Sequence, residues 1–168
     1  AQLLLWRKMA IRHPDSPMRN DSRLSRMLHV LIHLAERDAP ATSDDIAAML
    51  GTNPVVVRRT MGGLREAGYV RSDKGHGGGW SLARPLEAIT LLDIYTALGE
   101  PALFAIGMAD DDPRCRVEQA VNARLASAMH DAAALLRTRL QDVTLADVAR
   151  DFETEMSASP PLHHTRAV

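Results

Sequence analysis

The sequence of 168 residues is poor in cysteine and aromatic residues, and it contains no long apolar segment. Its one cysteine, Cys115, excludes an intrachain disulfide and any zinc or iron–sulfur site built from several thiolates. No apolar run approaches the roughly 20 residues of a membrane-spanning helix. The apolar start at residues 1–6 is too short for a signal peptide, and no small-residue cleavage site follows it. We therefore expect a cytoplasmic protein without a membrane partner.

Charge is unevenly distributed along the chain, although the net charge is only −1. Residues 1–90 contain 13 Lys and Arg against 9 Asp and Glu, whereas residues 91–168 contain 7 against 12. A basic half favours contact with phosphates, and an acidic half favours a surface turned away from nucleic acid. The asymmetry therefore suggests that any contact with DNA lies in the first half.

The first half of the chain predicts three helices followed by two short strands. The helices are expected at 22–36, 44–50 and 54–67, since apolar residues recur there at helical spacing. Ser22 can cap the first helix, Thr42 or Ser43 the second, and Asn53-Pro54 is a favourable start for the third. Strands at 69–71 and 80–82 flank a glycine-rich loop, which indicates a hairpin. This order of elements is that of a winged helix-turn-helix.

The second half predicts a dimerisation arm. After a helix at 90–98 capped by Thr90, a long helix is expected at 114–140 and a short one at 144–152. At 1.5 Å per residue the long helix would measure about 40 Å, which exceeds what a small domain needs. Its apolar positions recur every three or four residues, and we expect them to form the dimer contact: Val117, Val121, Leu125, Met129, Leu136 and Leu140.

The fold class that follows is mainly α with a small β wing, a winged helix-turn-helix plus a long dimerisation helix. We expect a disordered extension at 1–17 and the DNA-binding domain at 18–99. An effector loop and the dimerisation helices should occupy 100–155, and a disordered tail 156–168.

The third helix would enter the major groove of DNA, with Val57, Met61 and Leu64 facing the core. Arginine on its outer face suits base reading, because the guanidinium fork matches the guanine edge. Backbone N–H groups and hydroxyls near the turn suit phosphate contact. The residues predicted to contact DNA are Arg19, Thr42, Ser43, Thr52, Asn53, Val55, Arg58, Arg59, Arg65, Lys74 and His76. The alternative is that the arginines only form a solvated face.

Other functions have weaker support in the sequence. The glycine-rich loop joins two strands, whereas nucleotide-binding loops join a strand to a helix. His29 and His33 have a spacing that can bind metal, but no third ligand is evident, so a packed or solvated pair is preferred. No arrangement of residues suggests an enzyme. The alternative from another class is a protein–protein adaptor that uses a winged helix without DNA, for which the pair Arg58 and Arg59 would be unnecessary.

The stretch from Ser43 to Leu82 resembles the Rrf2 family of bacterial regulators, which includes the iron–sulfur regulator IscR and the nitric-oxide sensor NsrR. The segments that carry the resemblance are Asp45-Ile46-Ala47, Val57-Arg58-Arg59, the run from Leu64 to Val70 and the run from Lys74 to Trp80. The likeness covers about Met18 to Phe152 and places the family's usual start at Met18. It implies a homodimer that binds a palindromic operator in double-stranded DNA. We expect this dimer to act as a repressor, because a dimer bound to its operator can block polymerase.

Carried over by position, the family's base-contacting side chains fall near Val55, Arg58 and Arg59, and its wing cation falls at Lys74. The arginine pair is not the usual choice there, so we expect a different operator. His76 stands where the family commonly has proline, and Trp80 where tyrosine is frequent.

The resemblance also bears on cofactors and sensing. Cluster-binding members have three cysteines before the long helix, whereas this chain has only Cys115, so we expect no iron–sulfur cluster, no other cofactor and membership of the cluster-free branch. Cys115 would lie at the start of the long helix between two arginines, where a thiolate is favoured, and is a candidate redox sensor. The alternative is an inert residue, with Asp110 to Asp112 opposing the positive field. A small-molecule effector contacting the loop at 100–112 is a second route to regulation.

Overall fold

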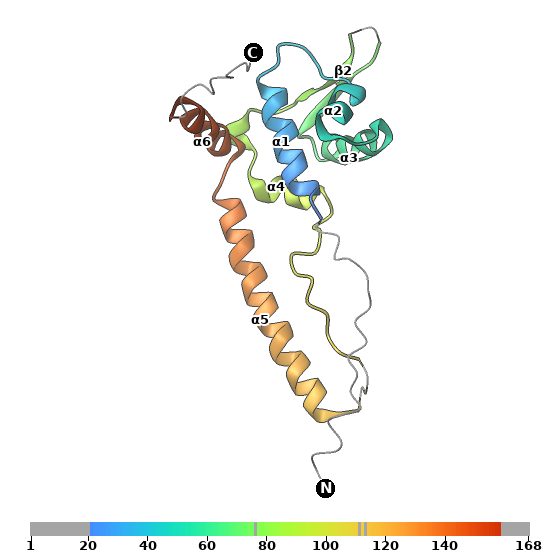
Figure 1. The fold of residues 1–168 in the computed structure, drawn as a ribbon, viewed down its shortest axis with the longest axis vertical. Helices are drawn as coiled ribbons and strands as arrows, with labels where there is room; N and C mark the ends of the chain where they lie inside the picture. The colour runs from blue at the N-terminus through green and yellow to red at the C-terminus, as the bar shows by residue number, and fades with distance from the viewer. Residues whose placement is uncertain (1–20, 76, 111, 113, 159–168) are drawn as a thin grey trace, which may run out of the picture.

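The computed structural model describes residues 21–75, 77–110, 112 and 114–158, with side chains up to residue 154. Its elements are α1 (Arg23–Ala35), α2 (Ser43–Leu50), α3 (Pro54–Glu66), β1 (Val70–Asp73), β2 (Gly79–Leu82), the short 3-10 helix η2 (Leu86–Ala88), α4 (Leu91–Ala97), α5 (Arg116–Gln141) and α6 (Leu145–Ala158). All but α5 gather at one end of the molecule, and α5 extends away from them (Figure 1). The predicted fold, mainly α with a small β wing, is confirmed.

Three helices begin with the same capping motif, a threonine followed three residues later by an aspartate. At α2 the backbone N–H of Asp45 donates to Thr42 Oγ1 (3.1 Å), and the Thr42 N–H donates back to the carboxylate (2.9 Å). The same pattern starts α4 at Thr90 and α6 at Thr144. The predicted caps at Thr42 and Thr90 are therefore confirmed.

The start of α1 differs from the prediction. Ser22 occupies the cap position, but its side chain makes no capping hydrogen bond. The carboxylate of Asp21 instead accepts from the backbone N–H of Arg23 at 3.0 Å. A carboxylate next to the first turn satisfies another of the unpaired N–H groups there and adds a favourable charge, so it can replace the serine.

A single apolar core unites α1, α2, α3, both strands and the segments that follow them. The predicted inward residues of α3, Val57, Met61 and Leu64, are fully buried. Leu145 of α6 is buried in the same core. Two backbone hydrogen bonds of 2.9 Å, one from Leu145 to Ile89 and one from Leu91 to Val143, hold the start of α6 against the start of α4. Helix α6 therefore packs with the winged helix, although the sequence-based division grouped it with the dimerisation arm.

The wing is an antiparallel hairpin in which Val70 pairs with Leu82 and Asp73 with Gly79. A bridge that the sequence did not predict joins the hairpin to Ala41, just before α2. A Cβ at Gly79 would lie 2.6 Å from the carbonyl oxygen of Ala41, so the close approach of these backbones requires glycine.

Helix α5 has 26 residues and none of them is buried. Helix α6 continues to Ala158 and so extends into the predicted tail. The predicted extension at 1–17 and the tail after residue 158 lie outside the described residues. Among the helices that the structure does describe, none combines the length and apolarity required to span a bilayer.

Candidate nucleic-acid interface

Helix α3 presents one face to the core and the opposite face to solvent. It begins at Asn53, whose Oδ1 accepts the backbone N–H of Val55 at 2.8 Å, with Pro54 at the first helical position. Because Val57, Met61 and Leu64 hold the inner face, the outer face is fixed in register. α2 and the preceding turn complete the helix-turn-helix geometry that places such a helix in a major groove.

The outer face combines cations with exposed apolar groups near the start of the helix. Arg58 and Arg59 are both exposed, as the sequence predicted. Val55 and Val56 are 57% and 54% exposed, and such side chains can contact the methyl group of thymine. Val56 was missed in the sequence-based prediction, although the inward register at positions 57, 61 and 64 already implies its exposure.

Arg58 faces the wing, and Arg65 lies farther along the helix. A cleft of about 250 Å³ is lined by Arg58, the start of α2 at Thr42 and Ser43, and wing residues from Ser72 to Trp80. Arg65 reaches β1 through a long contact of 3.5 Å from its Nη1 to Ser72 Oγ. The structure thus brings Arg58, Thr42 and Ser43 together, and it places Arg65 near the strand rather than at the leading end of α3.

The turn and the wing supply the remaining predicted contacts. The side-chain oxygen of Asn53 is used in the cap, which leaves its amide N–H groups available to donate, and Thr52 is half-buried. Lys74 is exposed near the tip of the hairpin. Arg19 and His76 lie outside the described residues.

The C-terminal end of α5 contacts the winged helix through a charged cluster. Arg137 donates to both carboxylate oxygens of Glu100, with Nη1 at 3.0 Å from Oε1, and its guanidinium lies 5.5 Å from the centre of the Tyr95 ring. Hydrogen bonding from Arg137 lowers the pKa of Glu100. Glu100 has a positive φ of 50°, a conformation that costs a non-glycine residue free energy. This contact ties the C-terminal end of α5 to α4 and the residue that follows its turn.

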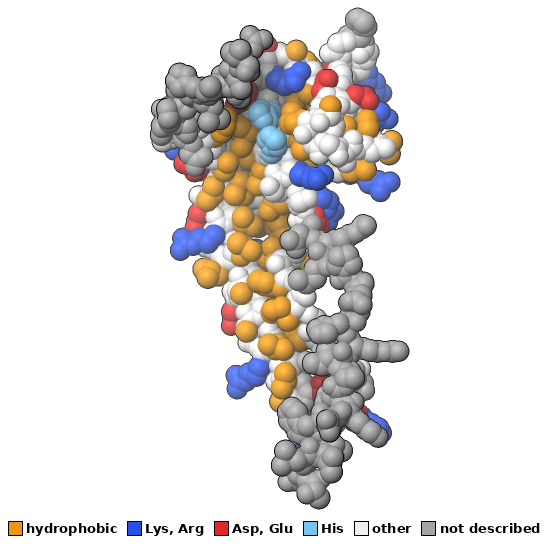
Figure 2. Space-filling model, in the orientation of Figure 1, with side chains coloured by type: hydrophobic (Ala, Val, Ile, Leu, Met, Phe, Trp, Pro, Cys, Tyr) orange, Lys and Arg blue, Asp and Glu red, His pale blue; other side chains and the backbone are white. Residues whose placement is uncertain are grey.

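Helix α5 exposes most of the side chains predicted for dimerisation. Val117, Val121 and Leu125 are 72%, 51% and 40% exposed, and Leu136 is also exposed while Met129 and Leu140 are partly buried. Apolar side chains form a stripe along α5 that continues toward the histidines of α1 (Figure 2).

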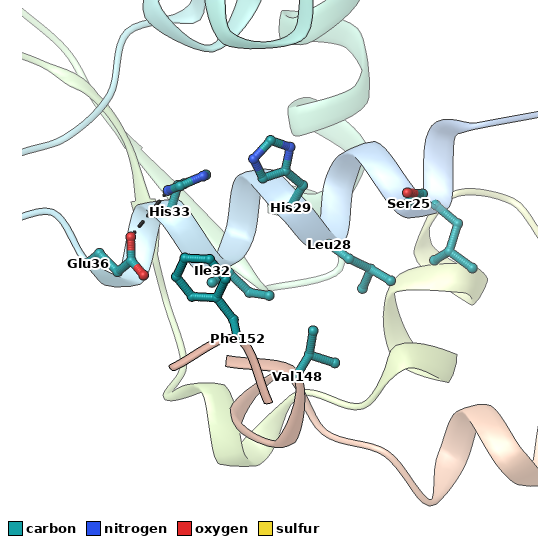
Figure 3. Close-up of a pocket in the computed structure, with 9 residues that line it drawn as sticks. Ser25, Leu28, His29, Ile32, His33, Glu36, Val148 and Phe152 are labelled. Atoms are coloured by element: carbon teal, nitrogen blue, oxygen red, sulfur yellow. Dashed lines mark hydrogen bonds and ion pairs between the residues drawn. The ribbon is translucent and has the colours of Figure 1, made fainter. Parts of the chain in front are cut away.

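The upper end of this stripe is a groove between α1 and α6 with a volume of about 530 Å³. Leu28 and Ile32 of α1 face Val148 and Phe152 of α6 across it (Figure 3). At its edge the rings of His29 and His33 lie 4.7 Å apart, and His33 Nδ1 contacts Glu36 at 3.2 Å. No group of three metal-ligating side chains occurs within the described part of the chain.

Cys115 lies at the start of α5, as predicted, but α5 begins at Arg116 and not at Arg114, so Cys115 occupies the N-cap position; it is partly exposed. Its side chain makes no capping hydrogen bond to the helix.

Comparison with known proteins places this geometry in a family. The model of the Rrf2 family, described as iron-dependent transcriptional regulators, matches residues 20–151. The chain belongs to the Rrf2 family. It is 32% identical over 129 residues to YwnA of Bacillus subtilis, a protein named as an HTH-type transcriptional regulator, covering 76% of this chain and 95% of that one.

Two solved structures extend the comparison. The T. potens IscR structure has 26% identity and a TM-score of 0.56, covering 80% of this chain and 85% of that one. The oxidized form of Staphylococcus aureus CymR has 25% identity and a TM-score of 0.56, covering 79% and 96%. The chain is therefore a DNA-binding transcriptional regulator of the winged-helix type.

Proposed function

We propose that this protein is a homodimeric repressor, without enzymatic activity, that binds a palindromic operator and responds to a molecular signal. The observation that carries the proposal is the pairing of a recognition helix that exposes two arginines with a 26-residue helix in which no side chain is fully buried. The first feature suits base reading, and the second needs a partner to cover it.

A second copy of the chain is the partner that fits best. An α5 helix of about 39 Å is long enough for two copies to cross and still reach each other's domains. In a two-fold symmetric dimer, the stripe of Val117, Val121 and Leu125 on each protomer would be buried against the other protomer. The groove between α1 and α6 continues that stripe, so one dimer could cover both apolar surfaces.

In such a dimer the two α3 helices would read two half-sites. Arg58 and Arg59 would contact base edges, with Val55 and Val56 against thymine methyl groups. Thr42, Ser43, Thr52, Asn53 and Lys74 would contact phosphates and fix the register of the protein on the duplex. A dimer on its operator would block access of polymerase to a promoter.

Selection of bound sequences from a random DNA pool, repeated at two salt concentrations, tests the proposal. We expect an enriched palindrome, and affinity that falls steeply with salt because phosphate contacts release counterions. The mass of the complex by sedimentation should correspond to two protomers on one site. Enrichment of a non-palindromic half-site by a monomer would contradict the dimer. No enriched sequence at low salt would favour the adaptor.

Cys115 is our candidate for receiving a redox signal. It lies partly exposed at the start of α5, between Arg114 and Arg116. Oxidation of this thiol to a sulfinate by added peroxide, which is itself reduced to water, would place a negative charge at one end of the dimer helix. Operator release under peroxide is therefore expected for the wild type but not for Cys115→Ser. Equal responses of both proteins would redirect the search to small molecules that contact the loop at residues 100–112.

A further inference from the structure

We infer that Trp80 and Ser43 form a latch that positions the wing relative to the helix-turn-helix when the protein binds DNA. Trp80 is only 8% exposed, and its indole Nε1–H donates to the Ser43 hydroxyl oxygen at 3.0 Å. Ser43 is the first residue of α2. The inference rests on the operator binding proposed above and assigns Trp80 and Ser43 a positioning role in it.

Two backbone hydrogen bonds also connect β2 to the segment just before α2. The Trp80 N–H donates to the carbonyl of Ala41 at 2.8 Å, and the Ala41 N–H donates to the carbonyl of Trp80 at 3.0 Å. β2 is thus fastened to the chain entering α2 by two backbone bonds and one side-chain bond. The side-chain bond is the one that substitution can remove without altering the backbone.

The latch controls where the wing cation lies. Trp80 pairs with Ser72 in the hairpin, and Lys74 lies two residues beyond Ser72, near the tip. At its other end the hairpin joins α3 through Gly68, which has a φ of 79° in a turn closed by backbone bonds from Gly68 to Arg65 and from Tyr69 to Leu64. Without the indole bond, the distance from Lys74 to Arg58 and Arg59 would be less firmly fixed.

The latch also orients the Ser43 hydroxyl. An indole N–H can only donate, so the Ser43 oxygen acts as acceptor toward Trp80. Its own hydrogen then remains free to donate to a phosphate oxygen at the cleft that Ser43 shares with Arg58. Loss of the indole bond should therefore weaken two contacts, one from the wing and one from α2.

The test compares Trp80→Phe and Ser43→Ala with the wild type on the selected operator. Each should lower affinity about threefold to tenfold, which corresponds to one or two hydrogen bonds. Ser81→Ala is the matched control, because the buried Ser81 hydroxyl in the same strand has no hydrogen-bond partner among the described residues. Its affinity should equal that of the wild type, and thermal unfolding confirms that each variant is folded.

A double-mutant cycle with Lys74→Ala separates positioning from simple loss of stability. If the latch positions the wing, Lys74→Ala should cost less affinity in the Trp80→Phe background than in the wild type. In the free protein, the Trp80 indole proton should exchange with solvent faster in Ser43→Ala than in Ser81→Ala.

Three outcomes would overturn the inference in distinguishable ways. Variants that bind as the wild type does, or a Lys74→Ala effect that is unchanged in the Trp80→Phe background, would remove the latch and leave operator binding intact. An unchanged indole exchange rate in Ser43→Ala would show that the bond does not persist in solution. A wild type that binds no DNA would refute the proposed function and the role of the latch together.

Discussion

The winged-helix half and the α5 arm of this protein are built in opposite ways. The first has a continuous core in which Leu31, Ile46, Met61 and Leu64 are fully buried. The arm is a regular helix of 26 residues in which no side chain is fully buried. Helices in proteins derive most of their stability from packing of an apolar face, so an unpacked α5 would be marginal alone. The contrast indicates that the winged helix, completed by Leu145 of α6, has its own core, whereas the arm depends on association.

The largest expected effect follows from placing a charge on the arm. Val121→Glu should abolish the dimer, because a carboxylate would be buried without a partner in the interface. Operator affinity should fall about 100-fold or more through loss of bivalent binding. Sedimentation and operator titration measure the two effects. Ala123→Glu, on nearly the opposite side of α5, is the control and should remain dimeric. A dimeric Val121→Glu would show that α5 is not the interface.

A smaller effect is expected on the recognition helix, in the well-packed half. Arg59→Ala should cost about 1–3 kcal/mol on the operator and relax its sequence preference. Arg59→Lys keeps the charge but not the fork, so it should retain binding to random DNA while losing discrimination. Titration of operator and random duplexes measures both. Equal losses on the two duplexes would mean that Arg59 contacts only phosphate.

Loss of the contact between Arg137 and Glu100, which connects the two regions, should reduce operator affinity less than the changes on α5 or α3. Arg137→Ala removes the contact with Glu100 and the packing over Tyr95, and because both charged side chains are 40% exposed we expect about a two- to fivefold loss of operator affinity. The dimer should persist and accept altered half-site spacing more readily. Arg139→Ala, an exposed position on the same helix, is the control. Unchanged spacing preference would show that this contact does not set the direction of α5.

The smallest effect concerns the pH dependence of the folded half. Hydrogen bonds from the Thr144 side chain and backbone lower the pKa of Asp147 below its ordinary value of 3.8. A pKa lowered by folding stabilises the protein at higher pH, and this contribution is lost as pH falls through the lowered value. Asp147→Asn should therefore unfold at a lower temperature than the wild type at pH 7, and the difference should shrink as the medium becomes more acidic than about pH 4.

Thermal unfolding from pH 7 to pH 2 measures this change. Asp151→Asn, an exposed position on the same helix, should show a smaller difference from the wild type at pH 7. A difference for Asp147→Asn that stays constant over the whole range would mean that the carboxylate charge does not stabilise α6.

What the sequence predicted well depends on local chemistry. Thr42 and Thr90 reveal the helix starts because capping needs only residues three apart, and Val57, Met61 and Leu64 reveal the inner face of α3 through their spacing. These features also oriented Arg58 and Arg59 correctly.

What the sequence did not reveal depends on contacts between distant segments. The bridge from Ala41 to Trp80 and the indole bond to Ser43 join positions almost 40 residues apart. The burial of Leu145 beside Ile89 depends on α5 ending where α6 can return to the core. Neither leaves a periodic pattern in one sequence, so both required the fold.

The return of Leu145 to the core has a practical consequence for dividing the molecule. The DNA-reading unit is discontinuous in sequence, because it needs residues 23–98 together with the segment that follows α5. A fragment that stops before α5 would lack one fully buried leucine and the backbone pairing around it, and should be a poor folder. Replacing α5 with a short linker between the two segments should instead yield a stable monomeric DNA-binding domain, onto which the α5 helix of a relative could be grafted.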